Sequence, residues 1–249
     1  MSIRENLDDI RQRLADAARR AGRGADDVRL MAVSKTFPAD AIREAYEAGQ
    51  RLFGENRVQE FAEKSAQLPH PVVQTAHDKD GAPAEISKAE FHLIGHLQSN
   101  KSAKAAELFD AIDSVDSLKL LQRLNDAAGK LNKRLGVLIE VNVGGEEAKS
   151  GLAPESPEVV EILRAAPSLE HVTIRGLMTV PPYTEDPKDA RPYFRRLRDL
   201  RETLELLRMP GVELAELSMG MSHDFEVAVE EGSTCVRVGT AIFGKREKL

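Results

Sequence analysis

Lys35 is the residue of this sequence best placed for covalent chemistry. It follows an apolar stretch, residues 30–34, that has the pattern of a buried β-strand, and Pro38 comes shortly afterwards. If Lys35 continues the strand, it shares a face with Val33, because side chains alternate along a strand. Burial lowers the pKa of a lysine, and a neutral amine can attack a carbonyl to form a Schiff base. The alternative is a strand-end lysine whose amine reaches solvent, and the residues alone leave both interpretations open.

Glycine and hydroxyl side chains recur in two segments late in the sequence. Residues 217–222 read LSMGMS, and residues 237–240 read RVGT. Glycine lets backbone N–H groups approach an anion, and the hydroxyl groups are further donors. The two segments together favour a phosphate-binding site. In the alternative interpretation they are tight turns, with Ser222 capping a short helix.

Arg237 lies inside an apolar run, residues 235–238, so a strand there would bury its guanidinium. A buried charge needs a partner. The partner is either a carboxylate such as Glu140 or an acceptor atom on a bound ligand, and the sequence leaves both open.

Two histidines, His92 and His96, have the spacing of a helical metal pair, but they lie in a predicted strand. On a strand, residues four apart are separated by about 13 Å, which one metal ion cannot bridge. We therefore expect no metal site, a structural role for both histidines, and His96 near the ligand. Cys235, the one cysteine, excludes a disulfide framework and a cysteine-rich metal site.

The elements that position these residues alternate between strand and helix patterns. Strands are predicted at residues 30–34, 52–55, 91–97, 111–115, 137–143, 172–179, 217–221 and 235–243. Several are apolar on both faces, as a covered parallel sheet requires. Eight such units in 249 residues predict one α/β domain, residues 1–249, folded as a single (β/α)8 TIM-type barrel. In such barrels the site lies at the C-terminal ends of the strands, and phosphate often binds after strands seven and eight.

Two segments stand outside this alternation. Ser2 and Glu5 form a predicted capping box that begins an extra N-terminal helix, residues 2–21, which we expect to cover the place of the missing eighth outer helix. Residues 67–90 hold three prolines and little periodicity, and we predict a mobile surface loop there.

Composition and charge exclude several classes of protein. The net charge of −6 and pI near 5.6 argue against a nucleic-acid-binding module. The N-terminus lacks the apolar core of a secretory signal, and no apolar run approaches the roughly 18 residues of a membrane span. We expect a cytoplasmic protein with no membrane or nucleic-acid partner.

Six motifs occur together in an order that resembles one family. They are AVSKT at 32–36, FGENRVQE at 53–60, HLIGHLQSNK at 92–101, GLMT at 176–179, LSMGMS at 217–222 and VRVGTAIFG at 236–244. The chain resembles the pyridoxal phosphate homeostasis proteins, relatives of the N-terminal barrel of alanine racemase, and the resemblance runs nearly end to end. Residues 67–90 are longer than we expect for that family.

The resemblance implies a fold-type III barrel that binds pyridoxal 5′-phosphate without a second β-domain. It implies that Lys35 holds the cofactor as a Schiff base and that Arg237 faces the pyridine nitrogen. It also implies that Asn56 lies beside the cofactor. The phosphate would be bound by Ser218, Gly239 and Thr240.

Two functional classes follow from that resemblance. Racemases of this barrel type carry an added β-domain with a catalytic tyrosine, for which this chain leaves no room after its last strand. An arginine facing the ring nitrogen disfavours protonation of the pyridine and weakens the cofactor as an electron sink. We therefore expect a monomeric, non-catalytic protein with no catalytic residues, which buffers pyridoxal phosphate and delivers it to apo enzymes that depend on it.

The main alternative is an amino-acid racemase-like enzyme, for which Tyr183 could act as an acid. A third class, a barrel enzyme acting on sugar phosphates, would share the phosphate loops but does not explain Lys35 together with Arg237.

Overall fold

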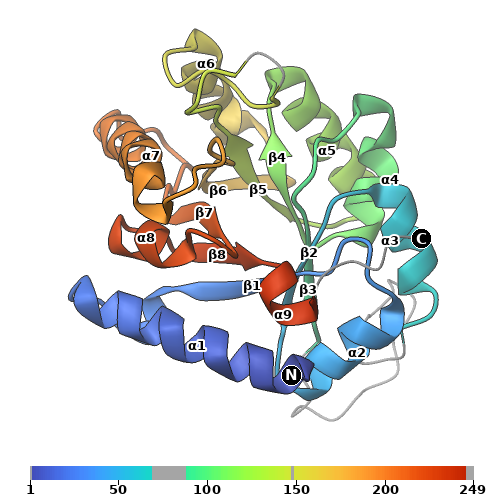
Figure 1. Ribbon diagram of the computed structural model, residues 1–249. Coiled ribbons are helices and arrows are strands. Elements are labelled where there is room, and N and C mark those ends of the chain that lie inside the picture. The colour runs from blue at the N-terminus through green and yellow to red at the C-terminus, as the bar shows by residue number, and fades with distance from the viewer. Residues whose placement is uncertain (1, 69–87, 147–148, 245–249) are drawn as a thin grey trace.

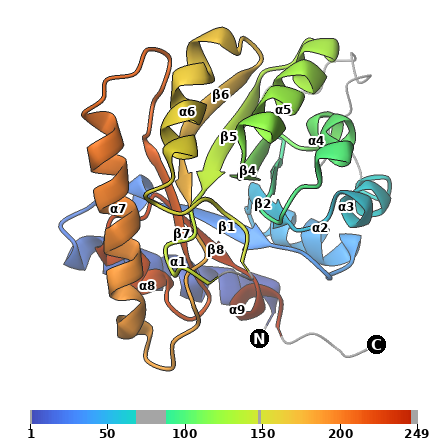
Figure 2. The same ribbon diagram turned by 90° about the horizontal axis from the view of Figure 1, so that it is seen from above.

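The computed structural model describes residues 2–68, 88–146 and 149–244, and these form a closed barrel of parallel strands (Figures 1 and 2). The strands follow one another around the barrel in chain order, and β1 pairs with β8 to close it. They are β1 Arg29–Val33, β2 Leu52–Glu55, β3 Glu90–Leu93, β4 Ala111–Val115, β5 Leu135–Glu140, β6 Val172–Met178, β7 Glu216–Met221 and β8 Cys235–Val238. The predicted (β/α)8 TIM-type barrel is confirmed.

Helices surround the barrel and bury their apolar faces against it (Figure 2). They are α1 Ile3–Arg20, α2 Ala39–Glu47, α3 Val58–Ser65, α4 Ser102–Leu108, α5 Leu118–Lys130, α6 Pro157–Ala165, α7 Arg191–Glu205, α8 Phe225–Glu230 and α9 Thr240–Phe243. Short 3-10 turns accompany them at Ala25–Asp27, Ser99–Lys101, Ala166–Ser168 and Pro187–Ala190. No helix in the described part of the chain combines the length and apolar character that a membrane crossing needs.

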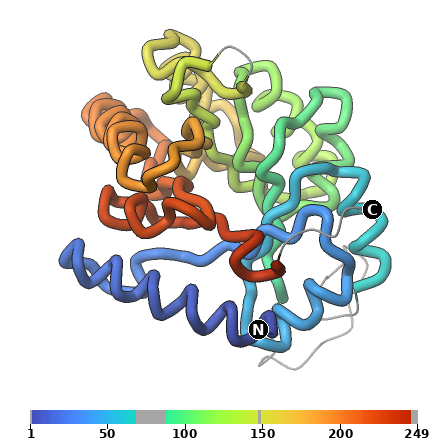
Figure 3. The backbone as a smooth tube through the Cα atoms, viewed as in Figure 1, coloured from blue at the N-terminus to red at the C-terminus, as the bar shows by residue number. Residues whose placement is uncertain are grey.

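The N-terminal helix α1 occupies the place predicted for it. Its capping box is present, with the Ser2 hydroxyl accepting from the Glu5 N–H and the Glu5 carboxylate accepting from the Ser2 N–H. The helix contacts α2, α8 and α9, and the amide of Asn6 donates to the carbonyl of Ile242 at 2.7 Å. Figure 3 shows the beginning and the end of the described chain side by side at this point. Helix α1 thus packs beside α8 and α9 on the outside of the barrel.

Three predicted strands end three or more residues earlier in the structure. The strands expected at 91–97 and 137–143 are β3, which ends at Leu93, and β5, which ends at Glu140. The strand expected at 235–243 ends at Val238, and its apolar continuation is the short helix α9 with Ile242 buried. Short apolar runs fit a buried strand or a buried helical turn equally well, so the pattern could not separate them. Of the loop predicted at 67–90, residues 69–87 lie outside the described residues.

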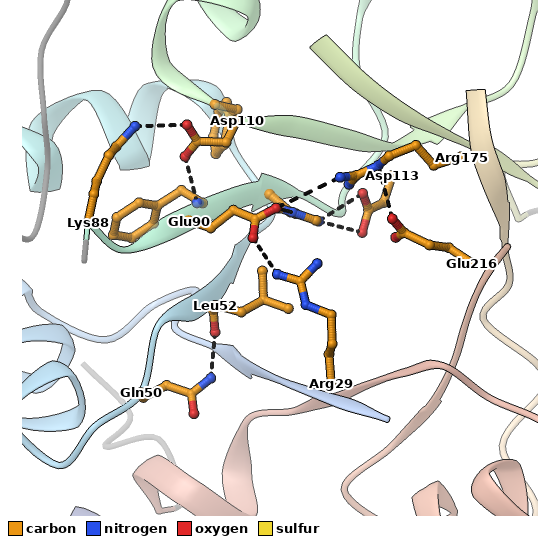
Figure 4. A network of polar contacts seen from close by, with 12 residues as sticks. Arg29, Gln50, Leu52, Lys88, Glu90, Asp110, Asp113, Arg175 and Glu216 are labelled. Carbon is orange, nitrogen blue, oxygen red and sulfur yellow. Dashed lines mark hydrogen bonds and ion pairs between the residues drawn. The ribbon is translucent and has the colours of Figure 1, made fainter. Parts of the chain in front are cut away.

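Charged side chains fill the floor of the barrel, at the N-terminal ends of the strands. Figure 4 shows Arg29, Glu90, Asp113, Arg175 and Glu216 pointing toward one another there. Arg175 Nε lies 3.1 Å from Glu216 Oε1, and Arg29 pairs with Glu90. Each of these cations faces at least one carboxylate, and the pairs connect β1 with β3 and β6 with β7 at this end of the barrel.

His92 lies at the centre of this network and is 1% exposed. Its Nδ1 lies 3.0 Å from Asp113 Oδ1, and its Nε2 lies 2.8 Å from Glu90 Oε1. Burial disfavours the charged imidazolium, but the carboxylates of Asp113 and Glu90 outweigh burial and raise the pKa of His92 to about 9. Burial likewise opposes ionisation of Glu90, yet its contacts with His92 and Arg29 lower its pKa to about 2. His92 is therefore a cation that binds strands together.

We predict that the stabilisation contributed by His92 is lost in alkaline solution. The folded protein holds this proton more tightly than the unfolded chain, whose histidine pKa is near 6.5. The contribution, roughly 3 kcal/mol, is fully present below about pH 6.5 and disappears as pH rises through about 9. Urea unfolding of the wild type and His92→Gln between pH 6 and 10 measures it. Their difference in unfolding free energy should shrink with rising pH. His171→Gln is the control, and a difference independent of pH would contradict the assignment.

Candidate functional site

A cavity of about 570 Å³ opens at the C-terminal ends of the strands. Residues from β1, β5, β7 and β8, from the loops that follow the strands, and from the start of α9 form its wall. The lining residues are Val33, Lys35, Phe37, Asn56, Ile94, Gly95, His96, Glu140, Val141, Lys149, Ser150, Val180, Met221, Ser222, His223, Arg237, Gly239 and Thr240. Five of the six residues predicted for the site lie here, and Ser218 does not.

Lys35 enters the cavity from the turn that follows β1. The turn is closed by a hydrogen bond from the Phe37 N–H to the Ser34 carbonyl at 3.0 Å. Thr36 adopts a left-handed conformation with φ of +68°, which is costly for a β-branched residue and turns the chain sharply after Lys35. The Phe37 ring packs against that of Phe243 in α9, with centroids 5.0 Å apart. Lys35 therefore lies on a tight turn that packs against helix α9.

Asn56 lines the cavity just after β2, where the chain passes very close to the loop after β3. A Cβ atom on Gly95 would lie 2.4 Å from the carbonyl oxygen of Asn56, so only glycine fits at that position. This close packing holds the Asn56 backbone at the cavity wall.

Arg237 is 4% exposed, and neutral acceptors surround its guanidinium. Nη1 donates to the carbonyl and the hydroxyl of Ser218, both at 2.7 Å, and Nη2 donates to the Thr179 carbonyl at 2.6 Å. Burial lowers the pKa of Arg237 from its ordinary value. No described carboxylate makes a salt bridge with it, so the alternative in which Glu140 is its partner is wrong. The guanidinium is held in place without being neutralised.

Ser218 lies below the cavity wall and is fully buried against Arg237. The hydroxyl that reaches the cavity from the same segment is that of Ser222, which accepts a hydrogen bond from the Gly239 N–H at 3.2 Å. Ser222 does not cap α8, because Asp224 is the cap residue and its carboxylate accepts from the Met221 N–H. Ser222 belongs to the segment 217–222 that the sequence favours as phosphate-binding, whereas the family resemblance names Ser218 as the ligand.

Gly239 and Thr240 complete this part of the wall where β8 gives way to α9. A Cβ atom on Gly239 would lie 3.2 Å from the Val33 carbonyl of the neighbouring strand, so the glycine allows β8 to run close to β1. Ser222, Gly239 and Thr240 therefore gather hydroxyl groups and exposed backbone at one end of the cavity, which is the chemistry of an anion site.

The opposite wall carries ionisable groups from β5 and the loops beside it. Glu140 is 6% exposed, its Oε1 accepts from the Ser150 hydroxyl at 2.8 Å, and its Oε2 has no hydrogen-bond partner among the described residues. Burial raises the pKa of Glu140. His96, predicted to lie near the ligand, lines the cavity and places Nδ1 3.1 Å from Asp116 Oδ2. In the described ranges, no three His, Cys, Asp or Glu side chains gather in a way that could hold a metal ion.

These residues fit pyridoxal phosphate, the cofactor implied by the sequence resemblance. Lys35 would offer an amine to its aldehyde, and the group of Ser222, Gly239 and Thr240 would offer donors to its phosphate. Arg237 presents a cation with no carboxylate partner in the described chain, and the cavity volume lies in the usual range for a cofactor site.

Comparisons with known proteins point in the same direction. The model of the alanine racemase N-terminal domain family matches residues 6–247. The pyridoxal phosphate homeostasis protein of Aquifex aeolicus is 45% identical over 247 residues, 99% of this chain and 100% of that protein. The structure of PipY from Synechococcus elongatus PCC7942 with pyridoxal phosphate bound is 38% identical with a TM-score of 0.76, covering 98% of this chain and all of that one.

A more distant comparison shows the fold alone. An alanine racemase of Clostridium difficile 630 is 16% identical, with a TM-score of 0.65. The match covers 99% of this chain and 57% of the racemase chain. The barrel is therefore similar to one part of a larger protein.

We predict that the hydroxyl groups of Ser222 and Thr240 bind the cofactor phosphate. The double variant Ser222→Ala with Thr240→Val should bind pyridoxal phosphate at least about a hundredfold more weakly, because it removes two hydrogen bonds to a charged group and each contributes about 1.5–3 kcal/mol. Its affinity for pyridoxal, which lacks the phosphate, should hardly change. Spectroscopic titration with both ligands measures this, with Thr203→Val as the matched surface control.

Ser218→Ala distinguishes the two serines in the same titration. Because Ser218 contacts Arg237, this variant should weaken both ligands to a similar degree. The assignment would be contradicted if Ser218→Ala lost affinity for pyridoxal phosphate alone while Ser222→Ala kept the affinity of the wild type. Ser218 would then be the residue that contacts the phosphate.

Proposed function

The chain belongs to the pyridoxal phosphate homeostasis proteins, and from that premise we propose that it binds pyridoxal 5′-phosphate as a Schiff base at Lys35 and buffers and delivers it inside the cell. The observation that carries the proposal is one cavity in which Lys35, a buried Arg237 and the hydroxyl groups of Ser222 and Thr240 come together. A related protein, PipY, has a structure with pyridoxal phosphate bound, which supports the choice of cofactor.

When bound, the cofactor would offer an aldehyde, with which a neutral amine can form a Schiff base and release water, and a phosphate that a cluster of donors can hold. Lys35 is the amine, and the tight turn after β1 directs it into the cavity. Ser222, Gly239 and Thr240 hold the phosphate at the ends of β7 and β8. We assign Ser218, predicted as a phosphate ligand, to holding Arg237 instead, because its hydroxyl is enclosed against the guanidinium.

Arg237 would face the pyridine nitrogen and Asn56 would lie beside the ring. A guanidinium keeps its own proton at any physiological pH, since its pKa lies far above 7. It therefore favours the unprotonated pyridine, and the three hydrogen bonds from Arg237 to neutral acceptors fix it in that orientation. An unprotonated ring withdraws electrons weakly, so the site favours holding the cofactor over using it.

The position of Tyr183 also supports a carrier. Tyr183 was the one predicted acid for a racemase-like reaction, yet its side chain is 77% exposed and does not line the cavity. Its ring packs in a tilted arrangement against that of His223, with centroids 5.3 Å apart. The racemase-like alternative therefore lacks its expected acid beside the cofactor. We further propose a monomer in the cytoplasm that passes the cofactor to apo enzymes.

We predict that reduction of the loaded protein with borohydride labels Lys35. Purified protein saturated with pyridoxal phosphate should show a visible absorbance band that borohydride removes, and peptide mapping should find the pyridoxyl group on Lys35. Lys149, the other lysine in the cavity wall, is the internal comparison. A label on Lys149 in the wild-type protein would contradict the assignment, and absence of any label would contradict the Schiff base.

A second prediction concerns turnover. Incubated with L-alanine in D₂O, the loaded protein should exchange the α-proton no faster than pyridoxal phosphate in solution, as followed by NMR. The same preparation should reactivate an apo enzyme that depends on this cofactor. Exchange at about 1 s⁻¹ or faster, a rate typical of enzymes, would establish the racemase-like alternative, and its loss in Tyr183→Phe would identify the acid.

A further inference from the structure

A second polar cluster lies behind the turn that carries Lys35, outside the cavity. It consists of Ser34 directly after β1, Glu55 at the end of β2, and Glu60 and Lys64 on α3. Glu55 is fully buried, and the Lys64 side chain is 10% exposed. None of these side chains lines the cavity, and the proposed function uses none of them.

The ammonium group of Lys64 is at the centre of this cluster. Its Nζ lies 3.0 and 3.1 Å from the two carboxylate oxygens of Glu55 and 2.6 Å from Glu60 Oε1. It also donates to the backbone carbonyl of Ser34 at 3.0 Å. An ammonium has three protons, so two carboxylates and one backbone carbonyl account for its donors. Lys64 thus connects helix α3 to the chain segment immediately before Lys35.

The cluster fixes the residues on both sides of Lys35. Before it, the Ser34 carbonyl accepts from Lys64 and the Ser34 hydroxyl donates to Glu55 Oε1 at 2.8 Å. After it, the N–H of Thr36 donates to Glu60 Oε1 at 2.6 Å. Thr36 is the residue with φ of +68°, a conformation that persists only when its surroundings hold it. Lys35 therefore projects from a segment whose two neighbours are both tied to the same ammonium and its partners.

The charges of the cluster depend on Lys64. Burial raises the pKa of Glu55, and Lys64 opposes that effect. For Glu60 burial acts in the same direction, but the hydrogen bonds from Lys64 and Thr36 outweigh it and lower its pKa. Without the Lys64 ammonium, the carboxylate of Glu55 would be fully buried with no cation beside it. The hydrogen bond that Glu55 accepts from the Ser34 hydroxyl would then lose the ion pair that holds its acceptor in place.

We propose that Lys64, acting through Glu60 and Ser34, is a positioning residue for Lys35: it fixes the turn from which the Lys35 amine meets the cofactor aldehyde. The inference rests on the proposed function, because it concerns the Schiff base at Lys35. It assigns Lys64 no contact with the cofactor.

The test compares pyridoxal phosphate with pyridoxine 5′-phosphate, which has the same ring and phosphate but an alcohol in place of the aldehyde. Only pyridoxal phosphate can condense with Lys35, so only the affinity for pyridoxal phosphate should depend on how the Lys35 amine is positioned. Glu60→Ala removes the acceptor for the Thr36 N–H from a partly exposed position and should leave the fold intact. Its affinity for pyridoxal phosphate should fall about tenfold, with that for pyridoxine 5′-phosphate within about twofold.

Three further variants sharpen the comparison. Glu60→Gln keeps an acceptor oxygen and should recover most of the affinity for pyridoxal phosphate. Lys64→Met should show the same selective loss as Glu60→Ala, and to a larger extent. Glu63→Ala, on an exposed position of the same helix, should change neither affinity.

Equal losses for both ligands in Glu60→Ala would show a merely structural role, and unchanged affinity for pyridoxal phosphate would show no role. Either result overturns the inference. Borohydride labelling of the wild-type protein separates these failures from failure of the proposed function. If Lys35 is labelled in the wild type but the variants lack the selective loss, only the positioning role is wrong.

Discussion

Pairing between β1 and β8 is the interaction on which the rest of the molecule depends. It places Met31 beside Arg237 and Ala32 beside Val238, although these residues are separated by most of the chain. The same pairing brings the end of β1, which Lys35 follows, to the side of the cavity that also carries Gly239 and Thr240. Helix α1 supports the closure from outside, since it contacts both α8 and α9 and its Asn6 binds the Ile242 carbonyl. Gly239 supports it from within, because a larger residue would press against the Val33 carbonyl.

Inside the closed barrel, the charged side chains have different partners at the two ends. At the floor, His92, Arg29 and Arg175 face carboxylates, so the charges there balance one another and hold strands together. A small apolar layer of Met31, Leu52 and Cys235 lies in the barrel interior. At the mouth, Arg237 has only neutral acceptors and Glu140 has one oxygen without a partner among the described residues. Charges that are balanced by the protein stabilise the fold, whereas charges left unbalanced are available to a ligand.

The sequence was sufficient to predict the barrel, the order of its strands, the N-terminal helix and the placement of Lys35. Those features follow from periodicity and from the location of residues at strand ends, both of which are local. Which of the two serines, Ser218 or Ser222, lines the cavity is not determined by the local sequence pattern. It depends on how β7 sits against β8, where the pairing shifts between Ser218 and Met221, and no hydrophobic pattern records such a shift. The cluster around Lys64 was missed for a similar reason, because its members come from two strands and a helix and resemble ordinary surface charges in the sequence.

The closure of the barrel has a consequence for when the protein can first hold its ligand. During synthesis Lys35 leaves the ribosome early, and the residues that complete the phosphate end of the cavity follow about 200 residues later. At ordinary translation rates that interval is about 10–40 seconds. For that time the lysine is on a nascent chain that has no eighth strand, and the chain cannot offer the combined site. A chain loaded with the cofactor is therefore one whose first and last strands have already met, so loading reports that folding is complete.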